Sequence, residues 1–268
     1  MRPLAELDRD EARRITGLLF DLDDTVLTHG VLGRAAYGAL WDLHEAGLRL
    51  VAVTGRPSGW AEVIVRQWPI DGAVTENGAV FVVRDGRGVA VIHDGTPEEV
   101  AARRARLDAL VARVREAMPG VTLADDVRAR RSDVAWDIGE RATLPDEEVA
   151  ALERLVVASG ARTTRSSVHL HASFERDDKA SGAIRFLRER FGEDPGRALG
   201  RWAFAGDSAN DAACFAAFRT TFGVANVRDF VHGPSGRARI AVPPRWVAAA
   251  ERGEGFAEIA RCLLAARA

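Results

Sequence analysis

Two aspartates lie two residues apart at the end of an apolar segment near the N-terminus. The segment Thr16–Leu22, TGLLFDL, predicts a short buried strand, with Asp21 and Asp23 at its carboxyl end. Side chains at i and i+2 of an extended chain point to the same side, so the two carboxylates face one site. Paired carboxylates repel each other unless a cation or a shared proton compensates. The pattern fits a nucleophile and an acid/base beside a hard metal ion, and equally a solvated acidic turn.

A second acidic cluster follows another apolar segment late in the chain. Residues 206–211, GDSAND, come directly after Trp202–Ala205 and precede a predicted helix. Ligands of open α/β sheets bind beyond the carboxyl ends of the strands, so we expect these acids at the same sheet edge as Asp21. Three or four converging carboxylates suit Mg²⁺, which prefers oxygen ligands. Taken alone, the cluster also fits a helix N-cap with acidic residues in the first turn.

Two further positions extend this set toward phosphate binding. Thr54 and Gly55 follow the predicted strand Leu48–Val53, where a hydroxyl and an unhindered backbone N–H can hold a phosphate oxygen or form an ordinary turn. Lys179 begins a predicted helix directly after two aspartates. A cation is unfavourable at that end of the helix dipole, which is a weak indication that this charge is functional.

The elements around these residues predict an α/β core interrupted by an insert. Strands and helices alternate up to residue 79, a rhythm typical of a parallel sheet with right-handed crossovers. An antiparallel α+β pattern follows, with a hairpin at 80–93 and a helix that starts at the capping box Thr96–Glu99. Another helix is expected to have Ser58 as its N-cap. We predict a Rossmann-like catalytic core of residues 1–83 and 175–268 and an inserted α+β domain of residues 84–174.

Composition excludes several classes of protein. The 268 residues carry 37 basic and 39 acidic side chains, a net charge of −2 that provides no excess to neutralise a nucleic-acid backbone. No apolar segment approaches the roughly 18 residues of a membrane span, and no signal peptide is evident. Cys214 and Cys262 have no partner motif and are expected only to fill apolar space. We expect a cytoplasmic protein, monomeric or a small homo-oligomer, that binds neither nucleic acid nor membranes.

The order of the four motifs resembles one superfamily. DxDxT at Asp21, TGR at Thr54, Lys179 and GDxxND at Gly206 are similar to the motifs of the haloacid dehalogenase-like (HAD) phosphohydrolases. The insert lies between the second and third motifs and follows Thr75–Ala79, TENGA, as in the subgroup with a type C2 α+β cap. The resemblance implies a Mg²⁺-dependent phosphatase with a cap that determines specificity.

The resemblance assigns roles by position. Asp21 is the expected nucleophile and Asp23 the expected general acid and base, while Thr54 and Lys179 hold the phosphoryl group. The metal ligands are expected to be Asp21, Asp23 through its backbone carbonyl, and Asp207, with Asp211 supporting the site. Residues expected to contact phosphate or substrate in the core are Gly55, Arg56, Asn77 and Asn210.

The substrate class is suggested by a weaker resemblance. The segments 132–137, 166–171 and 253–258 are similar to sucrose-phosphate, trehalose-phosphate and mannosyl-3-phosphoglycerate phosphatases. Sugars bind to hydrogen-bonding side chains beside an aromatic ring, so the candidates in the insert are Arg131, Trp136, Asp137, His169 and His171. Trp136 fits the core of the insert equally well, and the two histidines fit a solvated strand face. The expected substrate is a small phosphate ester, most simply a sugar phosphate, and the alternatives are a phosphosugar mutase and a phosphosugar-binding protein without activity.

Overall fold

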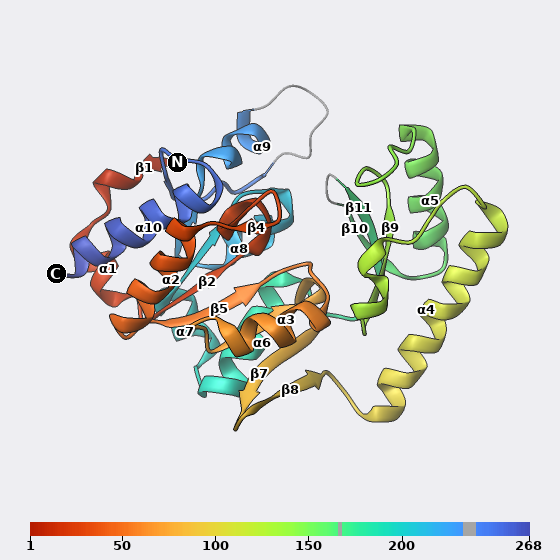
Figure 1. Ribbon diagram of the computed structural model, residues 1–268, viewed down its shortest axis with the longest axis horizontal. Coiled ribbons are helices and arrows are strands. Elements are labelled where there is room, and N and C mark those ends of the chain that lie inside the picture. The colour runs from red at the N-terminus through yellow and green to blue at the C-terminus, as the bar shows by residue number, and fades with distance from the viewer. Residues whose placement is uncertain (166–167, 233–239) are drawn as a thin grey trace.

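A large, mostly parallel sheet forms the centre of this computed structural model, which describes residues 1–165, 168–232 and 240–268 (Figure 1). The nine strands lie in the order β1 (Arg2–Pro3), β14 (Trp246–Val247), β13 (Thr220–Gly223), β12 (Trp202–Gly206), β2 (Gly17–Phe20), β5 (Arg49–Val53), β6 (Gly72–Thr75), β7 (Val80–Asp85) and β8 (Gly88–His93). The strands from β1 to β6 pair in parallel, whereas β7 and β8 add an antiparallel hairpin at one edge.

Helices cover both faces of this sheet because side chains of each strand alternate between two apolar cores. In β2, Leu18 and Phe20 belong to one core, and Leu19 belongs to the other. The first core is covered by α1 (Arg9–Arg14), α2 (Arg34–Glu45), α3 (Ser58–Gln67) and α10 (Arg252–Arg267). The second is covered by α6 (Lys179–Phe191), α7 (Pro195–Arg201), α8 (Ala212–Ala217) and α9 (Arg228–His232). This three-layered α/β arrangement confirms the fold class expected from the sequence.

A smaller α+β unit stands to one side of the main sheet (Figure 1). Its antiparallel sheet has the order β10 (Arg162–Arg165), β11 (His169–Ser173) and β9 (Asp133–Asp137). One sheet face packs on α4 (Pro97–Ala117) and α5 (Asp146–Ala158) around a separate apolar core. The opposite face points toward the main sheet.

The hairpin β7–β8 belongs to the main sheet, not to this smaller unit. All six residues of β8 pair with β7, and β7 pairs with β6. Residues 84–93, which the sequence pattern placed in the insert, therefore extend the central sheet. Antiparallel pairing alone could not reveal this, because the hairpin pattern does not say which sheet its first strand joins. The elements of the smaller unit follow β8 in the chain, from α4 to β11.

Local capping signals position two of the helices as expected and a third differently. At α4, Thr96 Oγ1 accepts from the Glu99 N–H and Glu99 Oε2 accepts from the Thr96 N–H, so the capping box is present. At α3 the N-cap is Pro57, and Ser58 is already helical. At α6 the side chain of Asp178 accepts from the Ser181 N–H, which starts the helix immediately before Lys179.

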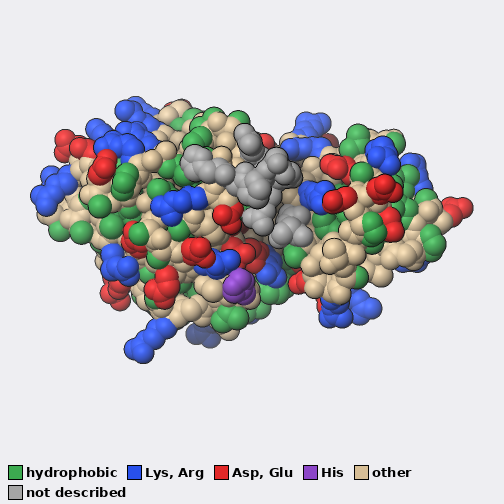
Figure 2. Space-filling model, turned by 90° about the horizontal axis from the view of Figure 1, so that it is seen from above, with side chains coloured by type: hydrophobic (Ala, Val, Ile, Leu, Met, Phe, Trp, Pro, Cys, Tyr) green, Lys and Arg blue, Asp and Glu red, His purple; other side chains and the backbone are tan. Residues whose placement is uncertain are grey.

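No helix in the described part of the chain is long and apolar enough to span a bilayer. Acidic and basic side chains are interspersed over the face seen in Figure 2, rather than gathered into a patch of one sign. That distribution agrees with the near-zero net charge.

Candidate active site

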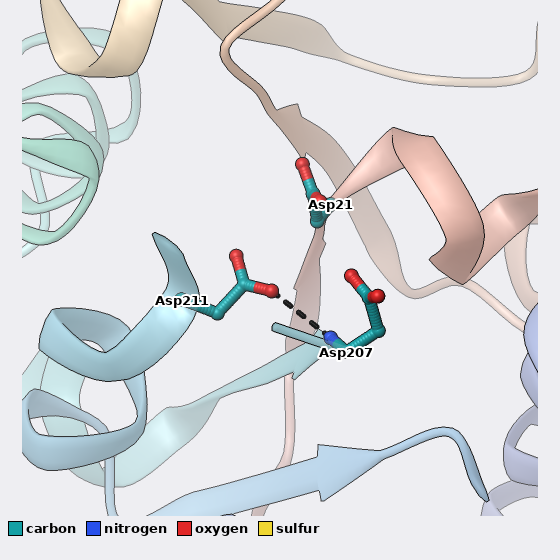
Figure 3. A group of neighbouring side chains, drawn as sticks. All are labelled: Asp21, Asp207 and Asp211. Atoms are coloured by element: carbon teal, nitrogen blue, oxygen red, sulfur yellow. Dashed lines mark hydrogen bonds between the residues drawn. The ribbon is translucent and has the colours of Figure 1, made fainter. Parts of the chain in front are cut away.

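Three buried carboxylates meet at the carboxyl edge of the main sheet. Asp21 follows β2 and Asp207 follows β12, and these two strands are parallel neighbours. Asp211 lies on the short turn that precedes α8. Figure 3 shows the three side chains around one point, and one carboxylate oxygen from each lies within 4.8 Å of the others. The parallel pairing of distant segments thus produces the acidic cluster that the two motifs predicted.

One lysine links two of these carboxylates. Lys179 Nζ lies 2.9 Å from Asp21 Oδ1 and 2.9 Å from Asp211 Oδ1. The other oxygen of Asp211 accepts from the backbone N–H groups of Asp207, at 2.9 Å, and Ser208, at 3.2 Å. Because both oxygens of Asp211 are already bonded, this residue is suited to orient Asp207 and Lys179.

Asp207 is oriented by two polar side chains, Thr25, which is the threonine of the DxDxT motif, and Asn226. Thr25 Oγ1 donates to Asp207 Oδ1 at 3.2 Å, and Asn226 Nδ2 donates to Asp207 Oδ2 at 2.9 Å. Asn226 also donates to the backbone carbonyl of Asp24 at 3.1 Å, so it ties the loop after β2 to the loop after β12. Asn226 lies outside the four motifs, and only the tertiary structure shows its role.

The cluster carries more negative charge than its lysine neutralises. Burial, assisted by the neighbouring carboxylates of Asp211 and Asp23, raises the pKa of Asp21 from 3.8 to about 7, although Lys179 opposes the shift. Burial and then Asp211 raise the pKa of Asp207 well above its usual value. Burial alone would lower the pKa of Lys179, but Asp21 and Asp211 raise it. Three carboxylates and one ammonium leave about two negative charges, a donor set that fits a divalent cation with oxygen ligands.

Asp23 lies beside this cluster and is held by a cation of its own. Arg56 Nε lies 3.1 and 2.8 Å from the two carboxylate oxygens of Asp23, and its Nη2 lies 2.5 Å from one of them. The guanidinium also stacks over the ring of Trp60, 4.1 Å from its centroid. Burial alone would lower the pKa of Arg56, but its hydrogen bonds with Asp23 raise it. The structure thus pairs two residues that the sequence assigned to separate roles.

The loops after β5 and β6 bring the other phosphate-binding candidates to the same edge. Thr54 is buried, and its Oγ1 accepts from the Arg56 N–H at 3.0 Å. Asn210 Nδ2 donates to Asn77 Oδ1 at 3.2 Å. A Cβ atom at Gly55 would lie only 3.0 Å from that same oxygen, which explains the glycine.

A cavity of about 300 Å³ lies between this edge and the insert. The core contributes Asn77, Lys179 and Asn210 to its lining, and the insert contributes Thr164 and His171 among others. Thr164 and His171 are paired across β10 and β11, so they share the sheet face that looks toward the core. The cavity therefore extends from Lys179, which is paired with Asp21 and Asp211, to the insert.

The other candidates in the insert are not among the residues that line this cavity, and their contact with substrate stays a prediction. Trp136 is only 1% exposed and packs in the apolar core of the insert, on the sheet face opposite His171. His169 Nε2 is paired with Glu140 Oε2 at 2.8 Å. Arg131 points outward to Glu62, at 2.7 Å. Period-two alternation in a strand does not identify which face is buried.

The structure describes only part of the segment 166–171, which the sequence analysis compared with sugar-phosphate phosphatases. Ser166 and Ser167 lie outside the described residues, whereas His169 and His171 lie on β11.

Comparison with known proteins yields structural relatives. The sequence matches no protein-family model and no curated protein. A Thermoplasma acidophilum protein superposes with a TM-score of 0.71 at 18% identity, covering 93% of this chain and 98% of that one. The sucrose-phosphatase of Synechocystis, solved with sucrose and phosphate, superposes with a TM-score of 0.61 at 16% identity, covering 93% of this chain and 98% of that one. An HAD subclass IIB sugar phosphatase gives 0.62 at 17% identity, covering 92% and 98%. These likenesses confirm that the chain has the fold of the capped phosphatases of the HAD superfamily.

Proposed function

We propose that this protein is a Mg²⁺-dependent phosphomonoester hydrolase that acts on a sugar phosphate or a similarly small phosphorylated metabolite. The observation that carries the proposal is the buried trio Asp21, Asp207 and Asp211, two of which are paired with Lys179. Lys179 also lines the cavity that extends to the insert. The structural relatives support the same class, because two of the proteins just compared are a sucrose-phosphatase and a sugar phosphatase.

The metal ion in this proposal is held by Asp21, Asp207 and the backbone carbonyl of Asp23. Asp211 remains hydrogen-bonded to Lys179 and to the Asp207 N–H, and so keeps the ligands in place. When bound, the cation offsets the excess charge of the carboxylates and the charge of the phosphoryl group.

The reaction is proposed to proceed in two displacements at phosphorus. An oxygen of Asp21 attacks, the bond from phosphorus to the ester oxygen breaks, and Asp23 gives its proton to the departing alkoxide. The carboxylate of Asp23 then takes a proton from water, the water oxygen attacks phosphorus, and the bond to Asp21 breaks with release of phosphate. Lys179 and the hydroxyl of Thr54 stabilise the charge on the transferring group.

Arg56 is proposed to change partners during this cycle. Asp23 has to leave the guanidinium before it can protonate a leaving group, since both of its oxygens now accept from Arg56. The phosphate of an incoming substrate is an anion that competes for the same guanidinium. Substrate binding thereby frees the Asp23 carboxylate, which takes up a proton from water before it acts as the acid.

The test is release of inorganic phosphate from a panel of phosphorylated sugars and other small metabolites. The expected result is hydrolysis of a few members with Mg²⁺, and loss of activity with EDTA and in Asp21→Asn. The matched control is Asp42→Asn, the same change on an exposed face of α2, which should leave the rate unaltered. Bisphosphate-dependent isomerisation of a sugar phosphate without net release would instead identify a mutase. Folded protein that is silent in both assays would contradict the proposal and favour a binding protein.

A further inference from the structure

A buried cluster of charges lies in the insert, directly against the core. Arg130 is bonded to Asp126, at 2.7 and 2.8 Å, and to both oxygens of Asp133, at 3.0 Å each. Asp133 Oδ2 lies 3.0 Å from His171 Nδ1. The Arg130, Asp133 and His171 residues are each more than nine-tenths buried. Burying a charged pair is costly unless it is fully satisfied, so an arrangement of this kind requires good geometry.

Arg130 also reaches across to the candidate phosphate loop. Its Nη1 donates to the backbone carbonyl of Gly55 at 3.1 Å. An Nη1 atom carries two hydrogens, and here one is directed at Asp133 and the other at Gly55. The guanidinium is therefore a direct link between the insert and the loop that follows β5.

This count of hydrogens fixes the tautomer of His171. Arg130 Nη1 lies 3.4 Å from His171 Nδ1, but it has no hydrogen left to donate there. The carboxylate of Asp133, at 3.0 Å, can only accept, so Nδ1 must carry the ring hydrogen. Burial lowers the pKa of His171 despite Asp133, which favours the neutral ring. Nε2 then keeps a lone pair, and His171 lines the cavity.

A carboxylate of the core holds the same segment from the other side. Glu76 Oε2 accepts from the backbone N–H groups of Arg131, Ser132 and Asp133, at 3.0, 2.5 and 3.1 Å. Glu76 Oε1 accepts from the Ser58 N–H at 3.0 Å, at the first residue of α3. Glu76 is only 1% exposed and has a φ of +51°, a backbone conformation that is costly outside glycine.

We propose that Arg130 and Glu76 are positioning residues that lock residues 130–133 of the insert to the core. This lock presents His171 Nε2 to the cavity, where it accepts a hydrogen bond from a hydroxyl of the leaving group. The part played by the leaving group rests on the proposed function. The lock itself rests only on the contacts across the interface. An acceptor in this position selects an ester whose leaving group carries a hydroxyl.

The lock has a readout that needs no catalysis. Ring ¹⁵N spectra of the full-length protein should show His171 protonated on Nδ1, and Arg130→Lys should alter this signal while Arg131→Lys leaves it unchanged. Lysine preserves the charge but cannot reach Asp133 and Gly55 together, and the exposed Arg131 is paired with Glu62. An Nε2–H tautomer in the unaltered protein, or identical spectra in the two lysine variants, would overturn the proposal.

Hydrogen exchange tests the contribution of Glu76. In Glu76→Gln the backbone amides of Ser132 and Asp133 should exchange at least tenfold faster, because glutamine offers one acceptor in place of two. Glu62→Gln is the matched control, since Glu62 bonds the side chain of the same segment and not its amides. Unchanged exchange in folded Glu76→Gln would refute the lock.

Selectivity tests the hydroxyl contact. With a sugar phosphate that the protein hydrolyses, His171→Gln and Arg130→Lys should each lower kcat/KM at least tenfold more than they lower kcat/KM for p-nitrophenyl phosphate, whose leaving group has no free hydroxyl. The double variant should lose little more than either single one, because both act through one contact. Equal losses on both esters would refute it. If the unaltered protein hydrolyses neither ester, the proposed function fails, and the ¹⁵N and exchange results still decide whether the lock exists.

Discussion

Replacing Asp21 with asparagine should make the metal-free protein more stable, and increasingly so as the pH rises. Asp21 is buried beside Asp207 and Asp211, and its pKa is about 7 in place of 3.8. A carboxyl group with a higher pKa in the folded state binds more protons when folded. Folding stability is therefore lost as the pH rises from about 4 through about 7, and asparagine removes that loss.

The size of the effect follows from the shift in pKa. A rise from 3.8 to about 7 corresponds to about 4 kcal/mol of unfolding free energy once Asp21 is fully ionised, at about 1.4 kcal/mol per pH unit. About 3 kcal/mol of this difference in unfolding free energy should develop between pH 5 and pH 8, a range in which urea unfolding of both proteins can be measured. Mg²⁺ at a hundredfold excess over its Kd should return about 3 kcal/mol to the unaltered protein and little to Asp21→Asn.

The assay is urea unfolding in EDTA at pH 5, 6, 7 and 8, repeated with Mg²⁺. The quantity of interest is the difference in unfolding free energy between Asp21→Asn and the unaltered protein. Asp42→Asn, on the exposed face of α2, serves as the control and should follow the unaltered protein at every pH. Parallel curves for Asp21→Asn and the unaltered protein across this range would refute the view that the cluster carries uncompensated charge.

Three other substitutions probe separate parts of the structure. Gly78→Ala should lower the unfolding free energy, measured in urea, by about 3 kcal/mol or more, because φ is +109° and the new Cβ would lie 2.1 Å from the Asp178 carbonyl oxygen. In the control Gly86→Ala, φ is +56° in open space, and the unfolding free energy should fall by only about 1 kcal/mol. Trp136→Ala should cost about 3–5 kcal/mol, whereas Trp136→Phe should leave kcat/KM within twofold, and a large change in selectivity for the phenylalanine variant would place this ring at the substrate after all. Asp207→Asn should abolish stabilisation by Mg²⁺ in thermal unfolding while raising Tm in EDTA, and an unchanged response to Mg²⁺ would remove Asp207 from the metal ligands.

The core was the more predictable part of the fold. Its strands are short apolar runs that stop at acids or at Thr54-Gly55, and alternation with helices is a local signal that implies parallel pairing. The sheet that the hairpin 80–93 joins was not predictable, because its pairing with β6 is decided by tertiary contacts. The structure places β8 in the central sheet, whereas the boundaries of the insert stay a prediction.

The site divides in the same way. Asp21, Lys179 and Asp207 could be recognised because motif spacing and strand ends indicated a shared location. Glu76 carried one weak signal, an acid directly after the apolar run that forms β6, but its role depends on a positive φ and on amides 55 residues or more away. Asn226 offered no signal at all. Residues that act by holding others depend on three-dimensional proximity, which spacing in a single sequence does not encode.

The order of the strands has a consequence for the synthesis of the protein. β2 is among the first strands to be made, but one of its two neighbours is β12, and Thr25 bonds Asp207 across 182 residues of sequence. A ribosome adding roughly 5–20 residues per second takes about 10–40 s to cover that distance. During this interval β2 has one open, apolar edge, a state prone to mispairing with other chains. The synthesis of β12 and Asp207 therefore both completes the cluster of three carboxylates and closes the aggregation-prone edge, so ribosomes stalled before residue 202 should yield chains that need chaperone protection.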